Sequence, residues 1–174
     1  MRITISGAPG SGTTTLGRAV AETFGYKYVS AGEVFRQYAR ERNIDIAELG
    51  KMAETDQTID LEIDSRQKQI GESSDNIVIE GRLAGWMVDN ADLKILLCAS
   101  PECRAQRIAD REGRDINEAL SQTVEREECE AKRYMDYYEI DIENHSPYDI
   151  VINSETFDAD ELVGIIEAAV RIMT

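Results

Sequence analysis

The chain has 174 residues, of which 34 are acidic and 19 basic, so its formal net charge at pH 7 is −15. A chain of about this length buries roughly 70% of its unfolded surface on folding, which is enough for one domain with a substantial core. The negative charge opposes binding to nucleic acid or to an anionic membrane surface, and we expect neither as a partner.

The spacing of the cysteines and the hydropathy of the chain indicate the cellular compartment in which we expect the protein. The cysteines stand at positions 98, 103 and 129, in no C-x-x-C spacing and in an odd number, which argues against a disulfide framework and a zinc site. No apolar run approaches the ~18 residues of a membrane span, and Met1 leads directly into a predicted strand rather than into a signal peptide. We therefore expect a cytoplasmic monomer whose partners are small molecules.

The first predicted strand, Arg2–Ser6, leads into a glycine-rich loop with the shape of a phosphate-binding loop (P-loop). Its residues are Gly7, Ala8, Pro9, Gly10, Ser11, Gly12, Thr13, Thr14 and Thr15, and a helix-periodic apolar run follows. Glycines let backbone N–H groups curl around a polyphosphate at the positive N-terminus of the next helix. The pattern G-x-x-x-x-G-K-[ST] is met at Gly7, Gly12 and Thr14, and the Thr14 hydroxyl is the predicted Mg²⁺ ligand.

Thr13 departs from this pattern, because it stands at the lysine position. That lysine normally contacts the β- and γ-phosphates, whereas a threonine donates one neutral hydrogen bond. We infer that an arginine, Arg107 or Arg126, replaces it. Two alternatives stay open here: a strand–turn–helix corner with incidental glycines, and a catalytically weak relative that binds a nucleotide without turning it over.

Four more apolar runs are predicted strands, and helical stretches separate them. The runs are Tyr26–Val29, Asn76–Glu80, Leu93–Cys98 and Asp149–Asn153. Alternating strands and helices indicate βαβ units, and therefore an α/β fold with a mainly parallel sheet covered on both faces. Several helix starts carry capping signals, at Ser30 with Glu33, Asp45 with Glu48, Ser100 with Pro101, Asp115 with Glu118 and Asp158 with Glu161.

Two helical excursions are longer than crossover connections require, and both leave the carboxyl ends of strands, where α/β proteins bind substrates. We therefore divide the single domain, residues 1–174, into a core of residues 1–29, 76–100 and 149–174, an acceptor-binding region of residues 30–75, and a lid region of residues 101–148. Each excursion is predicted to be a mobile flap.

Charged residues follow two of the predicted strands. The strand Asn76–Glu80 ends in Glu80, whose carboxylate can hold Mg²⁺ or its water shell, and Arg82 is placed to reach a substrate phosphate. The strand Tyr26–Val29 is followed by Ser30 and Gly32 at a second helix start, with Arg36 one turn on. Two phosphate sites indicate a donor and an acceptor nucleotide.

Arginine dominates the basic residues, with 14 of 19, and it binds phosphate through a bidentate fork. Six arginines gather in the second excursion, at positions 104, 107, 111, 114, 126 and 133. Closing over a triphosphate, they would stabilise the charge on the transferring phosphoryl group. The alternative is that they pair with neighbouring carboxylates on solvated helices.

These motifs, together with Ser30–Arg36, Glu80–Trp86, Arg107–Gly113 and Arg126–Tyr134, resemble the nucleoside monophosphate kinase family, in particular its short archaeal-type cytidylate kinases. The resemblance covers nearly the whole chain. It implies a P-loop NTPase-type five-stranded parallel sheet with helices on both faces, an acceptor-binding helical region and an arginine-rich lid. The implied activity is phosphorylation of CMP, and of dCMP, by ATP with Mg²⁺.

The resemblance also implies roles for individual residues. The loop Gly7–Thr15 would bind the ATP phosphates, with Asn153 beside the donor base. Acceptor contacts would come from Ser30, Gly32, Arg36, Asp60 and Arg82. The phosphates would be covered by Arg107, Arg111, Arg126 and Arg133, and Mg²⁺ would be held by Thr14 and Glu80.

The residues alone do not fix the acceptor base. Asp60, Asp64, Arg66 and Gln67 are spaced along one predicted helix and can supply cytosine contacts or form surface ion pairs. UMP or AMP remain alternative acceptors. A small hydroxy acid or sugar is another, because phosphate loops serve many acceptors, although a second anion site disfavours a neutral one. A structural or interaction protein is disfavoured, since no helix shows a heptad pattern.

Overall fold

The computed structural model describes residues 1–53 and 55–173. Its centre is a five-stranded, all-parallel sheet in the order β2-β3-β1-β4-β5. The strands are β1 (Arg2–Gly7), β2 (Lys27–Ser30), β3 (Ile77–Glu80), β4 (Leu93–Cys98) and β5 (Ile150–Asn153). The predicted five-stranded parallel sheet is confirmed, and the strand bounds differ from those predicted by one residue at most.

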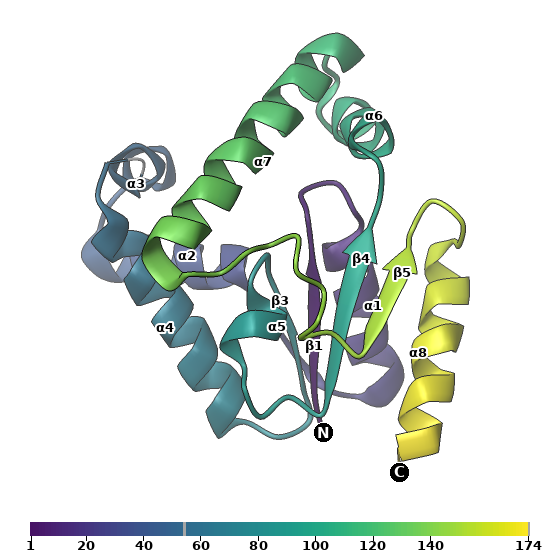
Figure 1. Cartoon of the computed structure of the whole chain (residues 1–174). Coiled ribbons are helices and arrows are strands. Elements are labelled where there is room, and N and C mark those ends of the chain that lie inside the picture. The colour runs from purple at the N-terminus through teal and green to yellow at the C-terminus, as the bar shows by residue number, and fades with distance from the viewer. Residues whose placement is uncertain (54, 174) are drawn as a thin grey trace.

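Helices cover both faces of the sheet, as predicted (Figure 1). On one face, α1 (Thr13–Phe24) and α8 (Ala159–Met173) place Leu16 and Ile166 against the β1 residues Ile3 and Ile5, all of them buried. On the other face, α4 (Gln57–Ser73) packs against β3, and the short α5 (Ala84–Met87) packs against β1 and β4. Because β3 is covered on both sides, Ile77, Val78 and Ile79 form a continuous apolar run.

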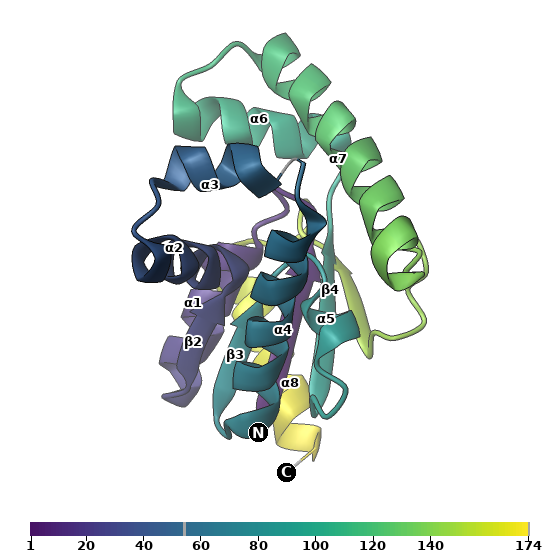
Figure 2. The same cartoon turned by 90° about the vertical axis from the view of Figure 1, so that its left-hand side faces the viewer.

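The two long excursions form helices beside and above the carboxyl ends of the strands. The first contains α2 (Ala31–Arg42) and α3 (Ile46–Ala53) before α4, and the second contains α6 (Pro101–Glu112) and α7 (Ile116–Tyr138). Figure 2 shows α6 and α7 arching over this end of the molecule, with α2 and α3 on the opposite side of the opening. None of the described helices is both long and apolar enough to cross a membrane.

The predicted capping signals begin these helices. Ser30 Oγ accepts the Glu33 N–H at 3.1 Å and Glu33 Oε2 accepts the Ser30 N–H at 3.4 Å, which makes a capping box at α2. At α6, Ser100 Oγ accepts the Cys103 N–H at 3.2 Å, with Pro101 in the first turn. Asp115 accepts two backbone N–H groups at the start of α7. Both excursions therefore start at defined residues next to strand ends.

Candidate active site

Two cavities open at the carboxyl edge of the sheet. The loop cavity, of about 370 Å³, is lined by residues 10–16, Arg107, Arg111, Ser154, Phe157, Asp158, Ala159 and Leu162. The arginine cavity, of about 550 Å³, is lined by residues 7–10 of the loop, by α2 and α4, by the end of β3 and by α7. Gly10, Thr13, Thr14 and Arg111 line both cavities, so the cavities meet at the start of α1.

The glycine-rich loop adopts a conformation that only glycine tolerates at two positions. Gly10 has φ +84° and Gly12 has φ +97°, which are left-handed values. At Gly10, an added Cβ would also lie 2.7 Å from the Arg104 carbonyl oxygen. The loop therefore runs directly against the backbone of α6, and its own N–H groups lie at the N-terminus of α1, where an anion binds favourably.

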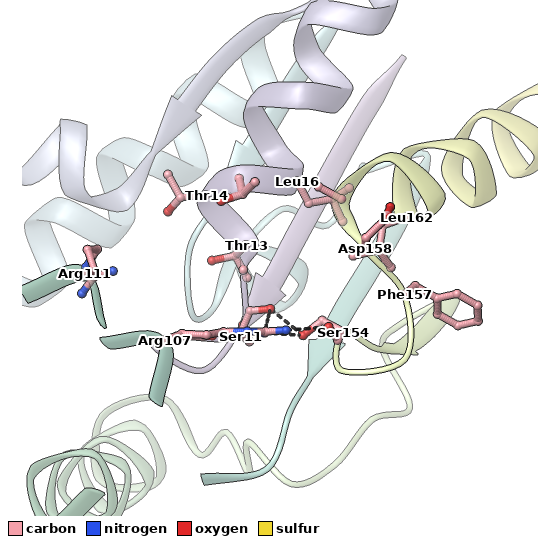
Figure 3. A pocket seen from close by; sticks show the side chains of 14 residues that line it. Ser11, Thr13, Thr14, Leu16, Arg107, Arg111, Ser154, Phe157, Asp158 and Leu162 are labelled. Atoms are coloured by element: carbon pink, nitrogen blue, oxygen red, sulfur yellow. Dashed lines mark hydrogen bonds between the residues drawn. The ribbon is translucent and has the colours of Figure 1, made fainter. Parts of the chain in front are cut away.

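Arg107 ties this loop to the end of β5. Its guanidinium donates to Ser154 Oγ at 3.0 Å and to the Ser154 carbonyl at 2.7 Å, and it reaches the Gly10 and Ser11 carbonyls at 3.4 Å. The Ser154 hydroxyl in turn donates to the Ser11 carbonyl at 2.7 Å. Figure 3 shows Arg107, Ser154 and Ser11 joined by these hydrogen bonds, whereas Arg111 lies apart on the side of Thr13 and Thr14.

Glu80 stands where the loop meets the end of β3. Thr13 Oγ1 donates to Glu80 Oε1 at 2.8 Å, the Tyr28 hydroxyl donates to Oε2 at 3.0 Å, and Thr14 Oγ1 lies 3.4 Å from Oε2. Burial, and then the neighbouring Glu80 carboxylate, raise the pKa of Tyr28 to about 12, so its hydroxyl keeps the proton that it donates. The position where related loops carry lysine is thus occupied by a donor to this carboxylate.

The donor set around Glu80 fits magnesium. Among the described residues, no group of three or more His, Cys, Asp or Glu could hold a metal by itself. Mg²⁺ is commonly bound by one or two protein oxygens together with substrate phosphates and water. The Thr14 hydroxyl and the Glu80 carboxylate, next to a phosphate-binding loop, are such a set.

The arginine cavity holds several cations whose partners are carboxylates of the protein. Arg82 lies 3.5 Å from Glu130, Arg126 lies 2.8 Å from the same carboxylate, and Arg133 lies 3.2 Å from Asp60. Arg36 has no ion pair within the described ranges. The cavity therefore offers guanidinium groups that are held by weak or shared contacts, or by none.

Several polar atoms of this cavity are buried without a hydrogen bond. They are Asp60 Oδ2, Arg82 Nε, Glu130 Oε2 and Arg133 Nε. Buried polar atoms are normally hydrogen-bonded, because losing water without a replacement costs ~1–3 kcal/mol each. The two guanidinium donors, Arg82 Nε and Arg133 Nε, can take an oxygen of an anionic ligand, whereas Asp60 Oδ2 and Glu130 Oε2 face Arg133 and Arg82 in the ion pairs described above.

Asp60 and Asp64 lie one turn apart on α4 and both line this cavity. Burial raises the pKa of Asp64 to about 6, although the Tyr138 hydroxyl donates to Asp64 Oδ2 at 2.6 Å and opposes the rise. Burial raises the pKa of Asp60 as well, against the effect of Arg133. The floor of the cavity is therefore a pair of partly buried carboxylates.

Comparison with known proteins decides the family. The sequence model of the cytidylate kinase-like family matches residues 2–156. A cytidylate kinase of Methanocorpusculum labreanum is 71% identical over 170 residues, which cover 98% of this chain and 96% of that protein. A cytidylate kinase of Archaeoglobus fulgidus is 50% identical over 172 residues, covering 99% and 96%. The chain belongs to the cytidylate kinase-like family.

This membership confirms the resemblance inferred from the motifs. It makes the chain a kinase that phosphorylates a nucleoside monophosphate, and the reading of Gly7–Thr15 as a structural corner with incidental glycines is wrong. Solved structures agree on the P-loop kinase fold. A shikimate kinase from Bacteroides thetaiotaomicron aligns over 98% of both chains with a TM-score of 0.69 and 15% identity. A deoxyadenosine kinase from M. mycoides aligns over 98% of this chain and 100% of that chain, with a TM-score of 0.59 and 18% identity.

In this kinase, nearly all residues singled out from the sequence line the two cavities. Every residue of Gly7–Thr15 lines one or both, and so do Ser30, Gly32, Arg36, Asp60, Glu80, Arg82, Arg107, Arg111, Arg126 and Arg133. Asn153 does not line either cavity among the described residues; its side chain accepts the Glu155 N–H at 2.9 Å, and the next residue, Ser154, lines the loop cavity instead.

Four other residues proposed for the cleft lie outside both cavities in the described part of the chain. Arg104 is buried and pairs with Glu127 at 2.6 Å. Arg114 pairs with Glu112 on the surface. Arg66 pairs with carboxylates of α2 and α4, and Gln67 donates to the Glu80 carbonyl. The charged or amide groups of these four residues bind other groups of the protein. Spacing along one helix does not reveal such partners.

Four residues at this end of the molecule, Tyr28, Tyr134, Ser154 and Phe157, were not among the predicted site residues. Tyr134 is buried in a cluster with Leu83 and Ile140, yet it also lines the arginine cavity. Ser154 and Phe157 follow the end of β5, and the rule that substrates bind at the carboxyl ends of parallel strands could have located them. Tyr28 lies on β2, packs on Gly17 of α1 and belongs to none of the motifs in the sequence.

Proposed function

We propose that this protein transfers the γ-phosphoryl group of ATP to CMP and dCMP with Mg²⁺. The observation that carries the proposal is the meeting of the loop cavity and the arginine cavity at Gly10, Thr13, Thr14 and Arg111. Two nucleotides bound in these cavities would bring their phosphates together at that junction. Phosphoryl transfer needs mainly such positioning and charge stabilisation, and no strong base.

The donor would occupy the loop cavity. Backbone N–H groups of Gly7–Thr15 would bind its phosphates at the N-terminus of α1. Thr14 and Glu80 would hold the Mg²⁺, which neutralises charge on the phosphates when bound. The donor base would extend toward the turn after β5, beside Asn153 and Ser154, where Phe157 offers an exposed aromatic ring.

The acceptor phosphate would occupy the arginine cavity near Arg36 and Arg82. Ser30 and Gly32 begin α2, whose N-terminus favours an anion, and Arg36 brings a cation that has no ion pair among residues 1–53 and 55–173. A bound phosphate would also supply an acceptor for the unsatisfied Arg82 Nε. The same groups disfavour a neutral sugar as acceptor.

Asp60 and Asp64 would select cytosine. The exocyclic amino group of cytosine is a donor, and an ionised carboxylate can only accept hydrogen bonds. Uracil presents a carbonyl oxygen at the same position, which two carboxylates would repel. None of these contacts addresses the ribose 2′-position, so dCMP is expected to be accepted with CMP.

The helices α6 and α7 would act as a lid that carries Arg107, Arg111, Arg126 and Arg133 onto the phosphates. The side chains of Arg111 and Arg126 are 66% and 63% exposed and are held by exposed or shared carboxylates. Pairs of this kind contribute ~1 kcal/mol or less, so phosphate can displace them. Arg133 would exchange Asp60 for a phosphate when the acceptor binds.

Acceptor selectivity tests this assignment of the base site. Asp60→Asn and Asp64→Asn are expected to lower the ratio of kcat/KM for CMP over UMP by about tenfold or more, because an amide can donate to the uracil carbonyl. Glu72→Gln, a charge-matched change on α4 outside the cavity, is the control. An unchanged ratio in both aspartate variants would refute cytosine selection by these carboxylates.

A further inference from the structure

Glu80, the proposed carboxylate of the magnesium shell, is fixed from several directions. Its backbone carbonyl accepts from Gln67 Nε2 at 2.7 Å. Its Oε1 accepts from Thr13 Oγ1 at 2.8 Å, and its Oε2 accepts from the Tyr28 hydroxyl at 3.0 Å. A carboxylate has about four lone-pair positions, so these donors leave others free for a metal-bound water.

Tyr28 reaches Glu80 from the neighbouring strand, and its ring is held in place. The strands β2 and β3 pair with Tyr28 beside Val78 and Ser30 beside Glu80. A Cβ added to Gly17 of α1 would lie only 2.9 Å from Tyr28 Cε2, so the ring packs directly on the helix backbone. The Arg18 guanidinium lies 5.6 Å from the ring centroid. The phenol therefore has one well-defined direction, toward Glu80.

We propose that Tyr28 is a positioning residue for phosphoryl transfer: with Thr13 it orients the Glu80 carboxylate toward the water shell of the Mg²⁺ that binds with the donor nucleotide. The inference rests on the proposed function for the metal nucleotide. It also gives Thr13 a role at the position where related loops carry lysine. A lysine there would bring a second cation to Glu80 and the phosphates, whereas threonine donates one neutral hydrogen bond to the carboxylate and adds no competing charge.

Calorimetric titration with ATP, with Mg²⁺ and in EDTA, separates positioning from packing. The measured quantity is the ratio of the two dissociation constants, which reports how much the metal strengthens nucleotide binding. Tyr28→Phe is expected to reduce this ratio about tenfold, the usual effect of losing a partner of a metal-shell ligand. Binding in EDTA should stay unchanged, which shows that the variant is folded. Tyr26→Phe, whose ring packs on Phe24 away from both cavities, should behave as wild type.

A double variant makes the test decisive. If Tyr28 acts through Glu80, then Glu80→Gln with Tyr28→Phe should show the same ratio as Glu80→Gln alone. The proposal would be overturned if Tyr28→Phe lowered the ratio equally in wild type and in Glu80→Gln, or if Tyr28→Phe left the ratio unchanged. It would also be overturned if Mg²⁺ did not strengthen the binding of ATP to the wild type. Wild type that binds ATP more tightly with Mg²⁺ but phosphorylates no CMP would instead refute the proposed acceptor and leave this inference standing.

Discussion

Thr13 removes one cation from the phosphate loop, and the charge must be supplied by another residue. Arg107 and Arg126 were the predicted substitutes. Arg107, however, donates to Ser154 and to carbonyls of the loop, and Arg126 lines the arginine cavity but not the loop cavity. Arg111 lines both cavities at their junction. Arg111 is therefore the arginine best placed to contact the transferring phosphoryl group.

Loss of Arg111 should slow the chemical step. Arg111→Ala is expected to lower kcat by roughly 10³-fold, the lower range for an arginine that stabilises this transition state. Thr13→Lys introduced into the Arg111→Ala variant should recover part of the loss, because it restores a cation at the junction. Steady-state kinetics with Arg114→Ala as control checks this, since Arg114 lies outside the part of α6 that lines the cavities. A kcat in Arg111→Ala equal to that of the control would contradict the assignment.

Asp64 makes stability depend on pH in a predictable direction. Its carboxyl has a native pKa of about 6 against an ordinary value of 3.8. The native state therefore holds a proton between these values that the unfolded state has released, and stability falls as pH rises through this window. Asp64→Asn should be more stable than wild type at pH 7 by about 3 kcal/mol and equally stable below pH 4.

Urea denaturation at both pH values measures this difference. The comparison between variant and wild type cancels the carboxylates that do not interact with Asp64; Asp60, whose charge raises the pKa of Asp64, is the exception. A stability difference that is the same at pH 4 and pH 7 would show that Asp64 is not the titrating group.

The candidate site residues were predicted best where a polar or charged residue stands at or just after the end of a strand. Glu80 and Arg82 follow β3, and Ser30 and Arg36 follow β2, so the rule that parallel strands present their carboxyl ends at one edge located them. It did not distinguish Arg104, which is buried, from Arg107 and Arg111 on the same helix. Helical spacing gives the face that residues share, whereas the packing of α6 on the loop and on α7 decides which of them reach the cleft.

At the scale of elements, Arg104 joins three parts of the active-site end. It donates to the Ala99 carbonyl at 3.1 Å, reaches the Pro9 carbonyl of the loop at 3.5 Å and pairs with Glu127 of α7 at 2.6 Å. Glu127 also lies 3.5 Å from Arg82. The loop, α6 and α7 are thus connected through one buried guanidinium.

Breaking this connection should destabilise the protein. Glu127→Gln leaves the Arg104 guanidinium buried without its counter-charge, which costs ~3 kcal/mol or more. Glu128→Gln, one residue on at an exposed position, should change little. Chemical denaturation measures both variants. A loss in Glu127→Gln no larger than in Glu128→Gln would mean that the ion pair does not hold these elements together.

The strands, the helix starts and the two excursions were predictable because local signals and the overall fold agree. Ser30, Ser100, Asp115 and Asp158 each begin the helix that their capping signal predicted. The strand ends were less predictable. Asn76 has φ +53° and stands just before β3, a left-handed conformation that no apolar pattern reveals.

At the scale of the whole molecule, the net charge of −15 coexists with a cleft rich in arginine. Like charges spread over the surface repel one another and destabilise the native state. Added salt screens this repulsion and also screens the attraction between the cleft and phosphates. Stability and substrate binding should therefore respond to salt in opposite directions.

Raising NaCl from about 0.1 M to about 1 M, which shortens the Debye length from ~10 Å to ~3 Å, should increase the free energy of unfolding. Over the same range the KM for the acceptor should rise, because the arginine contacts weaken. Urea denaturation and steady-state kinetics at matched salt concentrations measure the two effects. Stability that falls with salt would show that favourable ion pairs, such as those of Arg42 and Arg66 with Glu62, outweigh the net repulsion.

The most direct test of the proposed function is a coupled assay of ADP release with ATP, Mg²⁺ and one acceptor at a time. Two nucleotide cavities that meet at the phosphate loop, with a carboxylate pair on the acceptor side, predict rapid ADP release with CMP and dCMP and far slower release with UMP and AMP. Release of ADP with UMP or AMP in preference to CMP would contradict the assignment of the base site. Tight ATP binding without ADP release for any acceptor would contradict phosphoryl transfer itself.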